Sequence, residues 1–318
     1  MDQNNIWVAG PSGVAHYNSL TAKTTRYSYP DGLVGAFYRL KLAPGGSILA
    51  IGKDVFRFDG YAWKQDSKLF PDPKDWVVLD LIFAADGTPW MIGRYLPTWG
   101  AGDEIYRYDG MSWQKMLGGS FDVQFALSTD GKTIWATSWE GVKYYKNNSW
   151  GEISYPFDTL SPGIHIYDFV VDAQDHIWLT IGGTGKSGVL YYFDGSNWET
   201  IELEPNTALG TIWGDPVHGI WYPVQDYSTV TGDVELVHRI GMQVVTSISL
   251  PFDDISIYSF NAFTEAPDGS IWLGADGANR WTTPGQPGLY HFANEIWTRT
   301  LMDADIPYLS YEFLRCRK

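Results

Sequence analysis

The chain has almost no cysteine, no cluster of basic residues and no long apolar run, and each absence excludes a class of protein. A single cysteine, Cys316, rules out an intrachain disulfide framework and cannot form a zinc site alone. The formal net charge of −15, with Lys and Arg scattered, argues against a partner held through its phosphate backbone. No apolar run approaches the ~20 residues that span a bilayer. We therefore expect no nucleic-acid partner and no membrane span.

The start of the sequence also lacks a recognisable address. Residues 1–5, MDQNN, have neither the basic nor the apolar region of a signal peptide. The expectation is a cytoplasmic protein, or one whose address segment lies outside this sequence, so the compartment stays open. A hydrophobic content of 44% and a charged fraction of 19% are typical of a folded chain rather than a disordered one.

What the sequence does contain is one unit repeated seven times, and the unit is clearest between Asp172 and Trp198. This stretch, DAQDHIWLTIGGTGKSGVLYYFDGSNW, combines an Ile-Trp pair, an aromatic run, an Asp-Gly turn and a final Trp. The Trp of the pair, or its replacement, recurs at intervals of about 40 to 50 residues, which is the period of four-stranded propeller blades. These phase markers are Trp7, Leu49, Trp90, Trp135, Trp178, Trp221 and Trp272.

Four strands, named A to D in chain order, can be placed in each unit. Strand A precedes the marker, as in residues 167–171 and 258–263; strand B carries the marker, strand C is the aromatic run, and strand D carries the later Trp. Asp-Gly pairs occupy A–B turns, as at 86–87, and C–D turns, as at 194–195, where tight hairpins commonly need positive φ. No long stripe of helical period is present. The pattern predicts an all-β protein, a seven-bladed β-propeller of four-stranded antiparallel blades.

The two ends of the sequence complement each other. Residues 2–7 match the approach to strand B, so the first unit lacks strand A, whereas Tyr308–Leu314 match strand A and precede no strand B. We predict that the C-terminal strand pairs with residues 6–10, completes blade one and closes the ring. Closure would remove two free sheet edges. The predicted organisation is a single domain over residues 1–318, with blade one formed by residues 6–30 and 308–314.

Several segments share the pattern of a known repeat, among them Asp31-Gly-Leu33, Ile271-Trp-Leu-Gly274 and the GVLYYFDG run at 188–195. The unit resembles the two-component regulator propeller repeat over essentially the whole chain, with blade six, at Ile220-Trp-Tyr-Pro223, degenerate. The resemblance implies a propeller that acts as a ligand-binding sensor module, often for glycans, and an extracytoplasmic location. It also implies a signalling domain or protein partner that is not in this chain.

Loop lengths indicate which end of the blades binds a ligand. In a propeller the B–C and D–A connections share one end, here called the loop face, and the A–B and C–D turns share the other. The turns are short, whereas long B–C connections are expected at Arg94–Asp103, Gly182–Ser187, Pro223–Asp233 and Ala275–Gln286. Long loops cost ordering entropy and tend to be functional, so we expect the ligand at the loop face.

Tryptophan usage favours the same end. Eleven of the 16 Trp are in register and are expected to pack the blades, because large aromatic side chains bury much apolar area. They are Trp7, Trp90, Trp135, Trp178, Trp221 and Trp272 in strand B, and Trp63, Trp113, Trp150, Trp198 and Trp297 in strand D. The other five, including Trp213, fall at the loop face or at strand A. There a ring either stacks on a sugar, a cation or an apolar ligand, or fastens a long loop.

Charged side chains accompany these rings. An acidic funnel with aromatic walls favours polyhydroxylated or cationic ligands and repels polyanions, although solvated loop carboxylates give the same pattern. The predicted ligand is a carbohydrate or another small polar molecule. The candidate ligand-binding residues are Trp76, Trp99, Trp139, Trp281, Tyr167, Tyr258, Arg94, Arg280, Asp75 and Asp254.

Patterns for catalysis are sparse. Only His165, at the start of a strand A, is placed to face the predicted channel mouth, and a general base there would need a nearby acid such as Asp168, Asp254 or Glu312. No H-E-x-x-H, P-loop, G-x-S-x-G or calcium-loop pattern is present, so we expect neither metal nor cofactor. The favoured hypothesis is a non-catalytic recognition module. The alternatives are a lyase or hydrolase with a His–acid site, similar in architecture to streptogramin lyases, and a protein-interaction scaffold.

Overall fold

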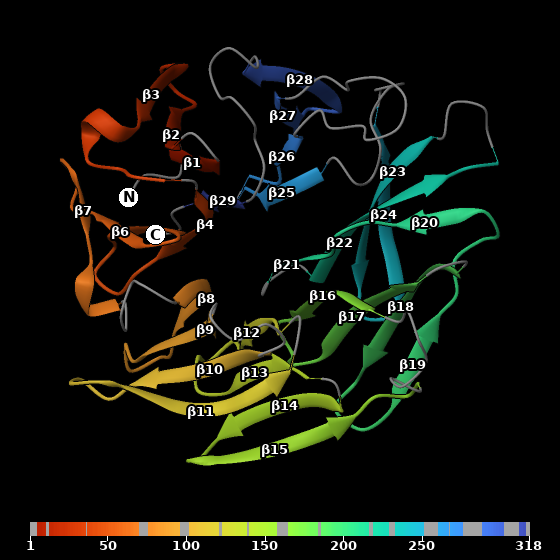
Figure 1. Ribbon diagram of the computed structural model, residues 1–318. Coiled ribbons are helices and arrows are strands. Elements are labelled where there is room, and N and C mark those ends of the chain that lie inside the picture. Colours follow the sequence, from red (N-terminus) through yellow and green to blue (C-terminus); the bar gives the residue numbers. More distant parts are fainter. Residues whose placement is uncertain are drawn as a thin grey trace. The chain divides into compact units, whose positions relative to one another are not determined.

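The protein is an all-β, seven-bladed propeller, which confirms the predicted fold class. The computed structural model describes residues 5–10, 13–35, 37–69, 76–95, 102–120, 123–138, 140–157, 165–183, 186–215, 219–228, 233–250, 260–266, 268–275, 288–301 and 312–315. Within these ranges the only helical segments are two short 3-10 helices, η1 (Tyr29–Asp31) and η2 (Ser67–Leu69). The strands form seven antiparallel sheets, the blades (Figure 1).

The chain divides into two compact units. The first comprises Met1–Gly119, Asn261–Ala278 and Gly285–Lys318 and carries blades one, two, three and seven; the second comprises Ser120–Phe260 and Asn279–Pro284 and carries blades four to six. The strands of blades one to three and seven are β1 (Asn5–Gly10), β2 (Gly13–Asn18), β3 (Lys23–Tyr27), β4 (Phe37–Leu42), β5 (Ile48–Gly52), β6 (Val55–Phe58), β7 (Trp63–Gln65), β8 (Trp76–Phe83), β9 (Pro89–Tyr95), β10 (Asp103–Tyr108), β11 (Trp113–Ser120), β25 (Phe260–Glu265), β26 (Ile271–Ala275), β27 (Gly288–Ala293), β28 (Ile296–Leu301) and β29 (Glu312–Arg315). Those of blades four to six are β12 (Phe125–Leu127), β13 (Ile134–Thr137), β14 (Gly141–Lys146), β15 (Ser149–Ser154), β16 (His165–Val171), β17 (Ile177–Gly183), β18 (Lys186–Phe193), β19 (Trp198–Ile201), β20 (Thr207–Leu209), β21 (Trp213–Asp215), β22 (Gly219–Asp226), β23 (Val234–Ile240) and β24 (Gln243–Ser249).

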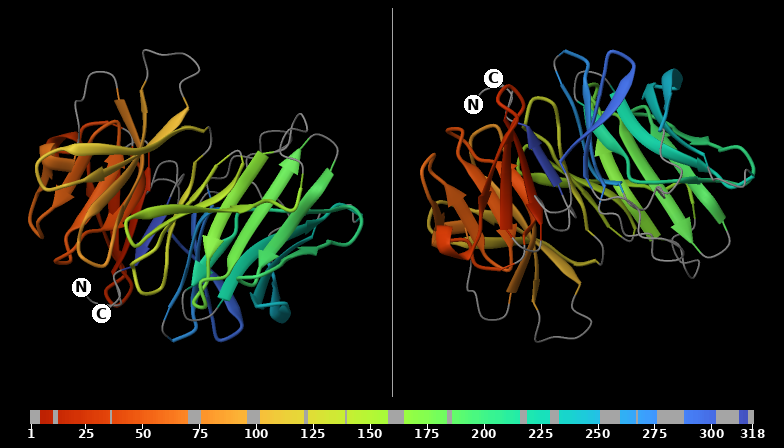
Figure 2. Two further views of the ribbon diagram at one scale, coloured as in Figure 1. Left: turned by 90° about the horizontal axis from the view of Figure 1, so that it is seen from below. Right: turned by 90° about the horizontal axis from the view of Figure 1, so that it is seen from above.

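Blade one joins the two ends of the sequence. β29 pairs antiparallel with β1, with Arg315 opposite Ile6 and Glu312 opposite Ala9, and the sheet order is β29-β1-β2-β3. The dark blue β29 accordingly lies beside red strands in Figures 1 and 2. The C-terminal strand therefore serves as strand A of blade one, with residues 312–315 described; residues 308–311 of the predicted strand 308–314 lie outside the described ranges. Closure of the ring stays a prediction.

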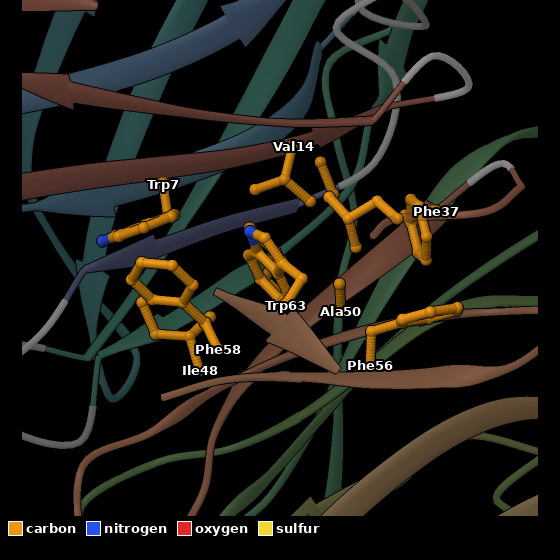
Figure 3. Close-up of a cluster of buried hydrophobic side chains, with 11 residues drawn as sticks. Trp7, Val14, Phe37, Ile48, Ala50, Phe56, Phe58 and Trp63 are labelled. Carbon is orange, nitrogen blue, oxygen red and sulfur yellow. The ribbon is translucent and has the colours of Figure 1, made fainter. Parts of the chain in front are cut away.

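Tryptophans from adjacent blades form the cores within each unit. Trp7 of β1 and Trp63 of β7 meet between blades one and two with ring centroids 6.2 Å apart, and Figure 3 shows the surrounding side chains converging on them. In the second unit, Trp135 of β13 and Trp198 of β19 share the core between blades four and five. In these cores a strand-B Trp packs on the following blade and a strand-D Trp on the preceding one. The packing role predicted for these in-register tryptophans is confirmed.

In every blade a large His, Arg or Tyr side chain of strand C lies directly opposite the marker residue of strand B. The cross-strand pairs are Trp7–His16, Leu49–Arg57, Trp90–Arg107, Trp135–Tyr144, Trp178–Tyr192, Trp221–His238 and Trp272–His291. The three histidine rings lie nearly parallel to their tryptophans, with centroids 4.4, 4.3 and 4.0 Å apart in that order. Burial lowers the pKa of His16 and so favours its neutral form. These three histidines are therefore part of the scaffold.

Several of the described A–B and C–D turns contain the predicted Asp-Gly pair. Gly87 and Gly195 have φ of 82° and 95°, a region that residues with a Cβ rarely adopt. The carboxylate of Asp194 accepts the backbone N–H groups of Ser196 and Asn197 at 2.8 and 2.7 Å. These hydrogen bonds lower the pKa of Asp194, because they favour its ionised form.

Blade six departs from the repeat in its first strand. Strand A is divided into β20 and β21, which both pair with β22. Between them the N–H of Gly210 donates to the carbonyl of Pro223 at 3.0 Å, so the backbone of Pro223 faces the interruption. Proline has no N–H to donate at that point of the ladder. Asp168 of blade five compensates in part, because it accepts the N–H of Ile212 at 3.0 Å.

Candidate functional site

The B–C connections are long in blades three, six and seven, as predicted. The B–C connections span residues 96–102, 227–233 and 276–287, whereas those of blades one and two span only 11–12 and 53–54. Blade five differs from the expectation. β17 and β18 extend until Gly183 pairs with Lys186, so the connection is residues 184–185 and not a long loop over Gly182–Ser187. That prediction was wrong because Gly182 and Gly183 continue strand β17 instead of ending it.

Two of the predicted ligand-binding side chains, Trp76 and Arg94, lie in the described part of the chain. They sit on adjacent strands of blade three, where Val77 pairs with Arg94 and Trp76 pairs with Tyr95. The backbones of Tyr167 and His165 lie in β16, and nothing is described of their side chains. The remaining candidates lie outside the described residues: Trp99, Trp139, Trp281, Tyr258, Arg280, Asp75 and Asp254.

Trp76 is the centre of an aromatic cluster at the loop-face end of blade three. Its ring centroid is 5.3 Å from that of Tyr95 and 5.2 Å from that of Tyr106, the latter at an interplanar angle of 87°. Trp76 and Tyr106 also pack against the buried core between blades two and three. Trp76 and Tyr95 remain partly exposed. We call Trp76, Tyr95 and Tyr106 the blade-three aromatic corner; β8, β9 and β10 can be followed in Figure 1.

Gly93 allows the Trp76 ring to approach β9 closely. Gly93 is directly opposite Val78 and is two residues from Tyr95, so it lies on the same face of the sheet as the cluster. A Cβ at Gly93 would stand 3.2 Å from Cε3 of Trp76 and 3.5 Å from Cζ3. The missing side chain therefore makes the space that the indole occupies. Gly93 therefore serves packing inside a strand, not a turn.

Charged groups border the aromatic corner on the same face. The hydroxyl of Tyr106 donates to the carboxylate of Glu104, which also accepts a hydrogen bond from Nζ of Lys115. Burial, and secondly the Glu104 carboxylate, raise the pKa of Tyr106, so this phenol stays protonated as a donor. Glu104 retains a partly exposed side chain and Lys115 is largely exposed. The corner thus combines apolar ring faces with a carboxylate and an ammonium group.

Arg94 lies on the other face of the blade-three sheet. Its Nε donates to Oδ1 of Asp103 at 2.6 Å, and the Asp103 side chain is 1% exposed while that of Arg94 is 38% exposed. A buried carboxylate of this kind needs its cation, because an unpaired buried charge is strongly destabilising. Arg94 therefore has a structural partner. Trp76 and Arg94 lie at the same end of adjacent strands, but on opposite faces of the sheet.

β16 carries the residues on which a catalytic alternative would depend. A bulge between Ile166 and Asp168 makes Tyr167 the extra residue of the strand. Oδ1 of Asp168 accepts the N–H of Phe169 at 3.0 Å, and Oδ2 accepts that of Ile212. Asp80 follows the corresponding bulge in β8 and likewise accepts the N–H of the next residue. Asp168, one of the acids considered as a partner for His165, is thus engaged with backbone.

Tyr95, Tyr106 and Glu104 were not predicted as site residues. Their signal was available, because Tyr95 directly precedes a long connection and Glu104 and Tyr106 alternate along strand C. Register decides which face these side chains take, and the pairs Tyr95–Trp76 and Tyr106–Met91 place them on the Trp76 face. A one-residue change of register would have put them on the other face.

No group of three or more His, Cys, Asp or Glu side chains within the described ranges could hold a metal ion. None of the helices in the same ranges has the length and apolarity needed to cross a membrane.

Comparisons with known proteins identify the fold but no family. No protein-family model matches the chain, and no curated protein matches it in sequence. An oligogalacturonate lyase from Vibrio parahaemolyticus has a TM-score of 0.58 and 11% identity, covering 96% of this chain and 81% of that one. A eukaryotic initiation factor has a TM-score of 0.51 and 12% identity, covering 98% and 87%.

The chain is also similar to part of a longer protein, the extracellular domain of a proposed one-component system from B. thetaiotaomicron. The TM-score is 0.45 and the identity 12%, and the match covers 99% of this chain and 40% of that one. This chain therefore spans less than half the length of that protein. Identities of this order show the fold alone, because one fold carries many unrelated functions.

Proposed function

We propose that the chain is a non-catalytic recognition module that binds a carbohydrate or another small polar ligand at its loop face. The observation that carries this proposal is the blade-three aromatic corner, where Trp76 and Tyr95 stay partly exposed at the edge of the long connection 96–102. The resemblance of the repeat to regulator propellers supports a sensor role, with a signalling partner outside this chain and an extracytoplasmic location.

The chemistry of the corner suits a polyhydroxylated ligand. Aromatic ring faces offer apolar contact to the C–H face of a sugar, and the edges of Tyr and Trp add hydrogen-bonding groups. Glu104 and Lys115 are available at the rim to accept from and donate to hydroxyl groups. The net charge of −15 works against polyanionic ligands. We therefore place neutral or cationic glycans ahead of acidic ones.

The contacts within the aromatic corner suit a binding role better than a catalytic one. The likeness to an oligogalacturonate lyase concerns the fold, and we assign no catalytic role to Glu104 or Tyr106. The hydroxyl of Tyr106 is already donated to Glu104, and Glu104 is paired with Lys115. Such mutual satisfaction holds a recognition surface in one geometry, which lowers the entropy lost on binding.

Glycan-array screening followed by tryptophan-fluorescence titration tests the proposal. Replacement of Trp76 by Leu should weaken binding of any array hit at least about tenfold, because a stacked indole contributes strongly to binding. Glu104→Gln should weaken it less, since the side chain can still hydrogen-bond. Tyr61→Ala is the matched control: Tyr61 is 95% exposed in a C–D turn, at the end of blade two opposite the loop face.

The outcomes separate binding from folding. Because Trp76 also packs in the blade core, each variant is first compared with the parent by thermal melting and near-UV circular dichroism. A folded Trp76→Leu variant that binds as the parent does would contradict the blade-three corner as the site. No binder among neutral, cationic and acidic glycans would contradict the proposed ligand class.

A further inference from the structure

The outer strand of blade six, β24, is unlike the other six outer strands. β3, β7, β11, β15, β19, β24 and β28 each end the order of their sheet, so each presents one unpaired edge within the described chain. Six of these strands contain Lys, Arg or Glu. β24, with the sequence QVVTSIS, contains none, and no charge occurs from Gly241 to Phe252.

β24 also lacks the tryptophan that is present in five of the other six outer strands, all except β3. In blade five Trp198 pairs with Phe193 across the C–D turn, whereas in blade six the corresponding residue opposite Ile240 is Gln243. All but one residue of β24 is exposed. Val244 and Val245 are 47% and 52% exposed, and Ile240 and Met242 beside them are 46% and 44% exposed. The strand therefore presents β-branched apolar side chains to solvent.

The backbone of β24 has free capacity on its outer side. The N–H of Leu250 donates to the carbonyl of Val234, so Leu250 faces β23. In an antiparallel ladder successive residues alternate between facing and avoiding the partner, so Ser249 and Ser247 direct their N–H and C=O groups away from β23. A bulge opposite His238 and Arg239 makes Val245 the extra residue, which confines the regular edge to residues 246–249.

Natural edge strands are protected by charges, prolines, bulges or covering segments, because an unpaired edge invites another strand. β24 has a bulge at one end but no charge along its length. We propose that this edge is a homotypic interface, in which β24 pairs antiparallel with β24 of a second copy of the chain.

Symmetry and charge favour a second copy as the occupant. A two-fold interface brings the same patch of both chains together, so residue i of one strand faces residue j of the other and j faces i. Each of the six charged outer strands carries charges of one sign only, so self-pairing would bring like charges into one short ladder, which disfavours it. Among the described outer strands, only β24 allows two copies to pair without adding like charges to the ladder, which matters in a chain of net charge −15.

Sedimentation velocity of the full chain over a concentration series measures the association. A pair of short strands buries little area, so a weak dimer is expected, with a dissociation constant on the order of 10 μM. Val245→Lys should raise this constant by about tenfold or more. The added lysine lowers the net negative charge of each copy, which weakens the overall repulsion between two copies. Weaker association of this variant would therefore come from the lysine at the strand edge itself.

Two further variants separate the edge from its side chains. Ser249→Pro removes an outward N–H and leaves the ladder with β23 intact, so it should also prevent dimerisation while the melting temperature is kept. Ile296→Lys in β28 replaces a 62% exposed apolar residue of another outer strand and should leave the dimer unchanged. A chain that stays monomeric about tenfold above the expected constant overturns the proposal, as does a dimer insensitive to Val245→Lys and Ser249→Pro.

Discussion

Blades five and six are built from the same repeat and lie in the same unit, yet they differ in their first and last strands. In blade five strand A is continuous apart from the bulge at Tyr167, and strand D begins with Trp198. In blade six strand A is divided into β20 and β21, and strand D has neither a tryptophan nor a charge.

The two central strands, B and C, have the same arrangement in both blades. Trp178 faces Tyr192 across β17 and β18, and Trp221 faces His238 across β22 and β23. All four side chains are buried. Strands B and C pair on both sides and these side chains are buried, so an altered residue there leaves a cavity or an unsatisfied group. Strands A and D each have a free edge, and their sequences can change for purposes other than packing.

The comparison predicts the largest loss of stability for substitutions in strands B and C, the two strands that blades five and six build alike. Trp178→Ala and Trp221→Ala should each destabilise the chain by about 3 to 5 kcal/mol, because each removes a buried indole and leaves a cavity. For Trp178 the loss includes a hydrogen bond from Nε1 to Oδ2 of Asp172 at 3.1 Å. Chemical unfolding followed by circular dichroism measures both. If Trp221→Ala lowered the free energy of unfolding no more than replacement of the half-buried Trp198 does, the idea that strands B and C form the conserved core of both blades would be wrong.

The next largest effect is expected where blade five supports the break in blade six. Asp168→Ala leaves the N–H groups of Phe169 and Ile212 without their acceptor, and the expected loss is about 2 kcal/mol. Asp168→Asn keeps one carbonyl oxygen and should lose about half as much. Equal melting temperatures for the parent and both variants would show that the hydrogen bond from the N–H of Ile212 to Asp168 does not stabilise the chain.

A smaller effect is expected where Gly214 of blade six packs against Val170 of blade five. A Cβ at Gly214 in β21 would stand 2.3 Å from Cγ1 of Val170 in β16, so one of the two must move. Gly214→Ala should cost about 1 to 2 kcal/mol through overpacking. Val170→Ala removes the obstructing methyl, and the double variant should recover part of the loss. Strictly additive losses in this cycle would show that the two residues do not compete for space.

The fold was predictable because its determinants are local and repeated. Asp-Gly turns, the Ile-Trp pair and the aromatic run each fix a hairpin, and the missing strand A at one end matched the extra one at the other. The bulges could not be predicted, since an extra residue such as Tyr167 changes no local pattern. The break at Pro223 was visible only as a degenerate motif, because it depends on which side of β22 the proline nitrogen faces.

The candidate site was less predictable than the fold. Trp76 was identified because it is out of register, but its neighbours Tyr95 and Tyr106 depend on strand register, and the space for its ring depends on Gly93. Arg94 was predicted as a ligand-binding residue, and the structure shows its pairing with the buried Asp103, on the face of the sheet opposite Trp76, which the sequence alone did not indicate. The long loop predicted for blade five was absent because its glycines are compatible with an extended strand.

The smallest expected difference between the two blades lies in their C–D turns and depends on pH. In blade five the backbone N–H groups of Asn197 and Ser196 lower the pKa of Asp194 below its ordinary value of 3.8, whereas the turn of blade six, Gly241-Met242, has no carboxylate. A carboxyl with a lower pKa in the folded state stabilises that state above its ordinary pKa. The stabilisation is lost as pH falls through the folded value.

Asp194→Asn should therefore destabilise the chain at pH 7 and make progressively less difference as pH falls below 3.8. Urea unfolding of parent and variant at pH 7, 4 and 3 measures the gap between their midpoints. Ser196→Ala is the matched control, because it keeps the backbone N–H that Asp194 accepts and should leave the pH dependence unchanged. A gap that stays constant from pH 7 to pH 3 would mean that the Asp194 carboxylate does not stabilise this turn through its charge, and that the C–D turns of blades five and six differ in sequence alone.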